Sequence, residues 1–175
     1  MPAAGGKNNG ASSGVWKSTD MGKHWTVASK GLWDTRINAL GVVKQEGPDA
    51  GKHVFVSTPG AVYESTDYAG SWTRVNVSTG SCYTFKNGTV NNEKVIFASC
   101  DGGIANYNIN SGKWSMFGPG GWGRAGYLSV SDSLGSNSVL GGCLGGHVWI
   151  GTEVNATHAD WNQTNASRPC VMYAS

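Results

Sequence analysis

Two near-copies of one hairpin pattern constrain the fold of this chain more than any other feature. The first copy covers residues 14–25 and the second covers residues 60–72. In each, a short run of β-branched and aromatic residues leads into Ser-x-Asp, passes a glycine, and reaches a tryptophan that starts another strand. We expect Gly22 and Gly70 to supply the positive φ that closes each turn. The pattern therefore predicts two β-hairpins.

This pattern resembles the Asp-box, or BNR repeat, of β-propellers such as sialidases, sortilin-type receptors and xyloglucan-cleaving glycoside hydrolases. Ala69 stands where the second copy should have its glycine, and Gly70 follows it. In those families the box fastens the outer hairpin of a blade and lies away from the ligand face, which implies a structural role here. The residues that match the box are Ser18, Asp20, Gly22 and Trp25 in the first copy, and Ser65, Asp67, Gly70 and Trp72 in the second.

Tryptophan spacing extends the repeat beyond the two boxes. Trp25, Trp72, Trp114 and Trp161 are separated by 47, 42 and 47 residues. One four-stranded propeller blade has roughly 40–45 residues. We therefore expect an all-β protein, a β-propeller of four-stranded antiparallel blades with Asp-box hairpins, with about four blades or an incomplete ring.

The expected organisation leaves the first blade short of strands. A flexible lead (1–13) precedes an outer hairpin (14–28), blades at about 36–76, 81–117 and 126–164, and one extra inner strand (169–175). The lead has no apolar stretch typical of a secretory signal, so we expect either that a leader has been removed or that the chain is a fragment. Open blade edges favour association. We expect self-association or a partner chain that completes the propeller, unless residues 169–175 close the ring.

Composition narrows the function classes. Glycine accounts for 27 of 175 residues and charged residues for only 14%, against about 25% in typical domains. A dispersed net charge of +2 argues against nucleic-acid binding. No apolar run is long enough to span a membrane. The four histidines are scattered and the cysteines lack metal-binding spacing, so we expect no metal and no cofactor.

Cysteines and sequons favour secretion. The expected register places Cys82 and Cys100 at the same end of one blade, so we predict the pairs Cys82–Cys100 and Cys143–Cys170, with four buried free thiols as the alternative. Five sequons lie in or beside expected loops, and we take them as glycosylation candidates. They are Asn76, Asn87, Asn155, Asn162 and Asn165. A secreted, extracellular glycoprotein is the leading interpretation.

The loops opposite the boxes carry the candidate ligand residues. Rings flanked by charged groups can stack on sugars and bond their hydroxyls; in the alternative, Trp33 and Trp122 pack between blades. The ligand-binding candidates are Trp33, Arg36, Trp122, Arg124 and Tyr127. The carboxylates on this face, Asp34, Asp101 and Asp132, are weak catalytic candidates. An inverting glycosidase needs two carboxyl groups about 6.5–9.5 Å apart.

Three functions remain open at this point. The first is a carbohydrate-directed propeller, either a module that binds a glycan or polysaccharide or part of a polysaccharide-degrading glycoside hydrolase. The second is a sortilin-like propeller that binds proteins. The third is an extracellular structural subunit that assembles through open blade edges. Sialidase activity is not expected, because the chain has four arginines and no Arg-Ile-Pro segment.

Overall fold

The computed structural model describes residues 13–76, 80–90, 93–117 and 127–131, and the strand backbones at 138–142, 148–152 and 160–163. Within these ranges the protein consists of antiparallel β-strands, with one 3-10 turn at Gly47–Asp49 and no α-helix. The predicted all-β class is confirmed. Nothing helical in the described ranges has the length and apolarity to cross a lipid bilayer.

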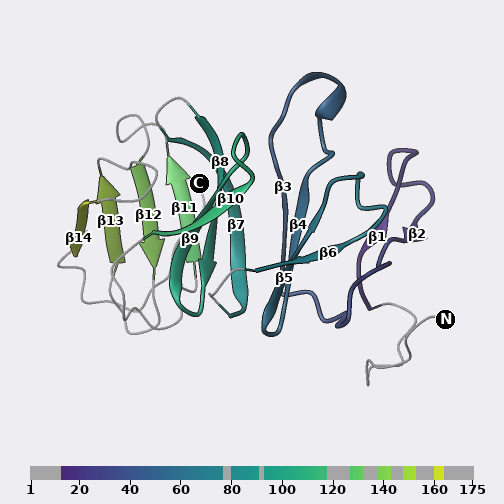
Figure 1. The fold of residues 1–175 in the computed structure, drawn as a ribbon, viewed down its shortest axis with the longest axis horizontal. Coiled ribbons are helices and arrows are strands. Elements are labelled where there is room, and N and C mark those ends of the chain that lie inside the picture. Colours follow the sequence, from purple (N-terminus) through teal and green to yellow (C-terminus); the bar gives the residue numbers. More distant parts are fainter. Residues whose placement is uncertain are drawn as a thin grey trace.

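The described strands form one hairpin and three four-stranded sheets, each a meander in which neighbours in sequence are neighbours in space (Figure 1). The hairpin pairs β1 (Trp16–Lys17) with β2 (Thr26–Val27). The first sheet contains β3 (Ala39–Val42), β4 (Val54–Thr58), β5 (Ala61–Ser65) and β6 (Thr73–Val75). The second contains β7 (Cys82–Val90), β8 (Glu93–Cys100), β9 (Gly103–Asn108) and β10 (Lys113–Phe117). The third contains β11 (Tyr127–Ser131), β12 (Ser138–Gly142), β13 (Val148–Thr152) and β14 (Asp160–Gln163).

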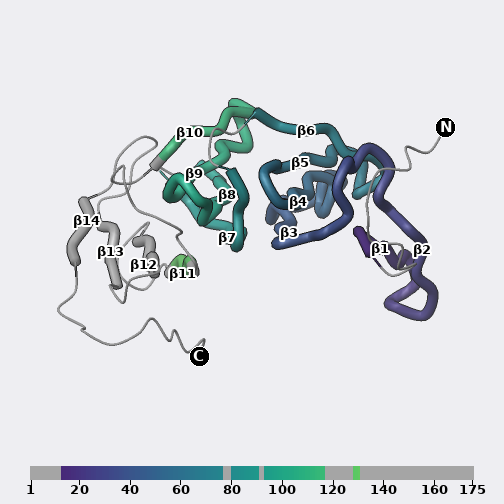
Figure 2. Tube along the Cα trace, turned by 90° about the horizontal axis from the view of Figure 1, so that it is seen from below, coloured from purple at the N-terminus to yellow at the C-terminus, as the bar shows by residue number. Residues whose placement is uncertain are grey.

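Successive sheets contact one another through their first strands. β3 contacts β7, and β7 contacts β11. Figure 2 shows β3 and β7 along one side of the row, with β6 and β10 along the other. The described strands form a row in sequence order and do not close into a ring. The expected inner strand at 169–175 lies outside the described residues.

The first sheet is covered on both faces, which explains why every residue of β4 is buried. Successive side chains of a strand point to opposite faces. Val54 and Val56 pack toward the hairpin, where they meet Val15 and Ala28. Phe55, between them, packs toward the second sheet. Two apolar clusters therefore fill the junctions on either side of this sheet.

Aromatic rings and one glycine fill the junction between the first and second sheets. The ring centroid of Phe55 lies 4.9 Å from that of Tyr107 and 5.3 Å from that of Trp114, both in edge-on geometry. Gly41 in β3 faces Phe85 in β7, and a Cβ at position 41 would lie 2.3 Å from the Phe85 Cβ. No side chain fits there. The glycine therefore sets how closely the two sheets approach.

The second sheet carries a disulfide at its end. Cys82 and Cys100 are register partners in β7 and β8, and their sulfur atoms are bonded. Both residues are fully buried. The predicted pairing of these two cysteines is confirmed, and the free-thiol alternative is wrong for them. Cys143 and Cys170 lie outside the described residues.

The β7–β8 hairpin is longer than its sequence indicates. The Asn87-Gly88 pair is typical of a turn, which would end the first strand of this hairpin before Asn87. Instead β7 continues to Val90, so the expectation that Asn87 lies in or beside a loop is wrong. The Asn87 side chain donates from Nδ2 to the Val42 carbonyl (2.9 Å) and accepts from the Lys44 amide (2.7 Å). These side-chain hydrogen bonds connect β7 to β3 and to the residues that follow it.

Candidate functional site

A groove of about 290 Å³ opens where the β2–β3 connection passes the β4–β5 turn. The connection contributes an aromatic ring and a carboxylate, the turn contributes backbone, and β5 and β6 contribute the floor. The lining residues are Trp33, Asp34, Thr58, Pro59, Gly60, Ala61, Tyr63 and Arg74. Two of the residues that the sequence placed on a ligand face, Trp33 and Asp34, therefore lie in one concave surface.

Trp33 is an exposed part of this groove. The Leu32 amide donates to the Ser29 carbonyl (3.1 Å), and Leu32 packs against the core between the hairpin and the first sheet. The chain then turns outward, and Trp33 is 87% exposed. The alternative in which Trp33 packs between two sheets is therefore wrong. A bare indole beside a groove offers a flat apolar surface to a ligand.

Asp34 is held by Arg36. The Arg36 backbone amide donates to Oδ1 (2.9 Å), its Nε lies 3.1 Å from both carboxylate oxygens, and its Nη2 donates to Oδ2 (2.6 Å). These side-chain hydrogen bonds lower the pKa of Asp34, although partial burial opposes the shift. Asp34 is therefore an ionised acceptor with a fixed orientation. A general acid of a glycosidase needs the opposite, a raised pKa.

The groove floor comes from two directly opposed residues of β5 and β6. Tyr63 and Arg74 are register partners. Tyr63 is almost completely buried, whereas Arg74 is exposed and donates from Nη2 to the Gly60 carbonyl at 3.5 Å. The groove therefore combines an aromatic wall, a carboxylate and a cation that can move toward a ligand.

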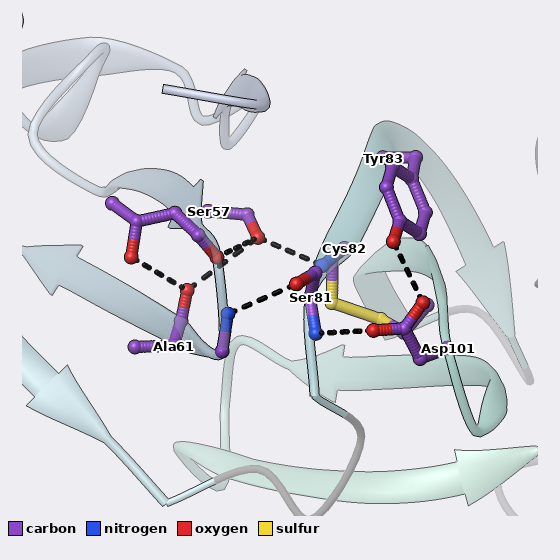
Figure 3. The surroundings of a disulfide bond; sticks show 9 residues. Ser57, Ala61, Ser81, Cys82, Tyr83 and Asp101 are labelled. Carbon is purple, nitrogen blue, oxygen red and sulfur yellow. Dashed lines mark hydrogen bonds between the residues drawn. A yellow bond between two sulfur atoms is a disulfide. The ribbon is translucent and has the colours of Figure 1, made fainter. Parts of the chain in front are cut away.

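Asp101 supports the groove from the neighbouring sheet (Figure 3). Its Oδ2 accepts from the Ser81 amide (3.0 Å) and its Oδ1 from the Tyr83 hydroxyl (2.7 Å). Ser81 Oγ in turn accepts from the Gly60 amide (2.9 Å) in the groove wall. Both oxygens of Asp101 thus hold the start of β7 in place. This geometry suits a supporting role, not that of a catalytic carboxylate.

The two Ser-x-Asp turns lie away from the groove. The groove meets β5 at its start, Ala61, and the second turn follows its end, Ser65. Asp67 Oδ1 accepts from the Gly70 and Ser71 amides at 2.9 and 2.8 Å. In the first turn Asp20 Oδ1 accepts from the His24 amide at 2.9 Å. The carboxylates of Asp20 and Asp67 thus accept hydrogen bonds within the turns that contain them.

Gly70 does not have the backbone conformation that we expected. Positive φ falls on Tyr68 (58°) and Ala69 (59°), the counterparts of Met21 (59°) and Gly22 (85°). Ala69 therefore takes the left-handed conformation that Gly22 takes in the first turn. A Cβ on Gly70 would lie 3.0 Å from Asp67 Oδ2, so the close approach of this carboxylate favours glycine there instead.

Several sequence candidates lie where their side chains are not described. Trp122, Arg124 and Asp132 are outside the described residues, as are the sequons at Asn155 and Asn165, and Tyr127 and Asn162 are described only as strand backbone. Within the described part of the chain, no cluster of three or more His, Cys, Asp or Glu could hold a metal ion. Comparison with models of known protein families gives no match, and neither does comparison with curated proteins.

Sequence reasoning missed the floor and the turn of the groove. Arg74 and Tyr63 lie eleven positions apart and meet only because β5 and β6 pair in one register. Gly60 entered the sequence analysis only as the first residue of the second hairpin pattern. The Pro59-Gly60 pair could have predicted the turn of the groove, because this pair indicates a tight β4–β5 turn. That turn marks the end of the sheet at which the Trp33 loop lies.

Proposed function

We propose that this chain is a carbohydrate-binding part of a secreted Asp-box β-propeller, with the sugar bound in the Trp33 groove. The observation that carries the proposal is the largely exposed Trp33 side chain beside the fixed carboxylate of Asp34. Sugars present apolar C–H faces and a rim of hydroxyl groups. An aromatic face and a preorganised acceptor match these two features with little entropic cost.

Binding is favoured over hydrolysis by the state of the carboxylates. Asp34 has a lowered pKa and Asp101 spends both oxygens on backbone and tyrosine donors. An inverting mechanism requires one protonated carboxylic acid and one base that activates water. Neither described candidate is arranged as the acid. The groove therefore serves as a recognition surface.

Fold and disulfide support the remaining parts of the proposal. Meandering four-stranded sheets whose first strands lie side by side are the arrangement expected of propeller blades. The Cys82–Cys100 bond is typical of an oxidising compartment. Asn76, exposed just after β6, is accessible to a glycosylating enzyme.

A glycan array followed by calorimetry tests this function. The intact chain is screened against neutral oligosaccharides, and the strongest binder is titrated into wild type and Trp33→Ala. Loss of the stacking surface should weaken binding roughly tenfold or more. Asp34→Asn should weaken it less, because the amide keeps one acceptor oxygen but loses the charge and the Arg36 clamp.

Trp25→Ala is the matched control, since it also removes an exposed indole but lies in the hairpin away from the groove. It should bind the same sugar as wild type does. Absence of binding to every glycan on the array, or an unchanged affinity in Trp33→Ala, would contradict the proposed function.

A further inference from the structure

The β4–β5 turn (58–61) forms one wall of the Trp33 groove, and two residues where the second sheet begins hold it in place (Figure 3). The Gly60 amide donates to Ser81 Oγ (2.9 Å). Directly before the turn, Ser57 Oγ accepts from the Cys82 amide (2.8 Å). Ser57, Ser81 and Cys82 are buried, and hydrogen bonds shielded from water are costly to break. The shape of the groove wall therefore depends on where Ser81 and Cys82 lie.

The disulfide fixes the position of Ser81. Ser81 precedes Cys82 and Asp101 follows Cys100, so the bond between the two cysteines brings Ser81 and Asp101 together. The Asp101 amide donates to the Ser81 carbonyl (2.9 Å), and the Ser81 amide donates to Asp101 Oδ2 (3.0 Å). The disulfide, Ser81 and the groove turn are thus joined by one series of contacts.

A register shift separates this end of the β7–β8 hairpin from the rest of its ladder. Cys82 is opposite Cys100, but Thr84 is already opposite Ser99, so the register shifts by one residue around Tyr83. From Thr84 to the end of β7 the pairing is regular. A shift of this kind interrupts the backbone ladder. The disulfide therefore fastens an end of the hairpin that the regular ladder does not reach.

We infer that the Cys82–Cys100 bond controls the affinity of the Trp33 groove for its ligand, so that the oxidised protein binds more tightly than the reduced protein. The inference rests on the proposed function, because it concerns the regulation of the same groove. In the oxidised protein, the bond holds Ser81 where its hydroxyl oxygen meets the Gly60 amide. Without the bond, hydrogen bonds alone hold Ser81 beside Asp101, and the turn loses its fixed support. Ser81 is thus a positioning residue, since it acts on the ligand through Gly60.

The controlling reaction is thiol–disulfide exchange with a dithiol reductant. The reductant gives two electrons and two protons to the Cys82–Cys100 bond, which becomes two thiols, and is itself oxidised to a disulfide. Both cysteines are fully buried, so this end of the hairpin must open before the reductant reaches them. A ligand that binds the oxidised groove more tightly must, by linkage, oppose the reduction by the same factor.

Calorimetry and a redox titration of one cysteine variant test the inference. In Cys143→Ser/Cys170→Ser, Cys82 and Cys100 are the only cysteines left, so a dithiol acts on this pair alone. The glycan that binds most strongly on the array should bind the reduced form at least about threefold more weakly than the oxidised form, which corresponds to the loss of about one hydrogen bond. Saturating glycan should raise the dithiol concentration needed for half-reduction by the same factor.

Two single substitutions separate positioning from general stability. Ser81→Ala keeps the disulfide but removes the oxygen that accepts from Gly60, and should weaken glycan binding about as much as reduction does. Asp67→Asn is the matched control, because it disturbs the turn at the other end of β5. It should melt at a lower temperature than wild type and bind the glycan equally well. Equal affinities of the oxidised and reduced forms, or an equal loss in Asp67→Asn, would overturn the inference.

Hydrogen exchange of the Gly60 amide, followed by NMR, gives a readout that needs no ligand. This amide should exchange faster in the reduced protein and in Ser81→Ala, while the Phe55 amide in the middle of β4 keeps its protection. Unchanged exchange at Gly60 after reduction would overturn the inference whether or not a glycan binds. If no glycan on the array binds, the proposed function is contradicted, and the exchange of Gly60 still decides whether the disulfide positions the turn.

Discussion

At the scale of single residues, two aspartates hold the tight turns of the hairpin and the first sheet. Asp67 accepts four hydrogen bonds, from the Ser65 and Ser71 hydroxyls and from the Gly70 and Ser71 amides. The hydroxyl bonds, led by that of Ser65, lower its pKa well below the ordinary range. Asp20 is lowered in the same direction, chiefly by the His24 amide. The folded state therefore prefers both as carboxylates.

This preference predicts how Asp67→Asn changes stability with pH. A carboxyl group whose pKa is lower folded than unfolded stabilises the fold above the unfolded value, about 3.9, and loses that contribution as pH falls further through the folded value. At neutral pH the variant should therefore melt at a lower temperature than wild type. The difference should shrink progressively below about pH 4. Melting curves by circular dichroism across this range provide the measurement.

Asp49→Asn is the control, because Asp49 forms an exposed ion pair with Lys52 (3.0 Å). An exposed ion pair of this kind contributes little. A melting difference for Asp67→Asn that stays constant from neutral to strongly acidic pH would contradict the assignment of its pKa.

At the scale of elements, the β7–β8 hairpin joins the second sheet to the first. Its two strands are tied at one end by the Cys82–Cys100 bond, and the Cys82 amide donates to Ser57 Oγ of β4 (2.8 Å) (Figure 3). At its other end Asn87 bonds to the backbone that leaves β3. The hairpin is thereby fastened to its neighbour at both ends and by Phe85 in the middle.

Removal of the disulfide should destabilise the whole β7–β8 hairpin. A bond between residues 18 positions apart closes a loop whose restriction is worth about 3 kcal/mol. Cys82→Ser/Cys100→Ser should lose about that much stability in denaturant unfolding. Its stability should respond less to a reductant than the stability of wild type does. Cys143→Ser/Cys170→Ser should keep the 82–100 linkage in non-reducing peptide maps, and free thiols at 82 and 100 in that control would refute the pairing.

Elements with a strong local signal were predictable from the sequence, and those that depend on neighbours were not. The Ser-x-Asp hairpins follow from side chains that bond within their own turn, and the Cys82–Cys100 pair follows from the strand order. The prediction for Asn87 was wrong because Asn-Gly is a local turn signal. Its side-chain amide instead donates to β3, more than forty positions away. Only part of the groove was predictable from the sequence. Trp33 and Asp34 share one loop, but Arg74 joins them only through strand pairing.

At the scale of the whole molecule, the sheets are stacked in a row, and glycines set the spacing between them. Gly41 in β3 accommodates Phe85 of the second sheet. Gly88 in β7 lies against Phe97 of its own sheet and Val130 of the third, and a Cβ there would lie 2.6 and 3.2 Å from their nearest atoms. The first and second sheets therefore each have a glycine at a point of close contact with the next sheet.

Gly41→Ala tests this spacing. The added methyl group would overlap the Phe85 Cβ, which cannot move without its backbone, so the junction must open. Overpacking of this kind costs about 1–3 kcal/mol. Denaturant unfolding of the variant beside Leu40→Ala, a half-exposed neighbour, measures the cost. Equal stability of the two variants would show that the sheets can separate freely.

These glycine contacts also limit how such a chain can change its number of repeats. The glycine belongs to one unit and the side chain that fills its space belongs to the next, as with Gly41 and Phe85. A unit that is duplicated or exchanged alone keeps its own glycine and its own packing side chain. It loses the residues of the two neighbouring units that fitted them. We therefore expect a unit exchanged alone to fold less stably than one exchanged together with the neighbour that it contacts.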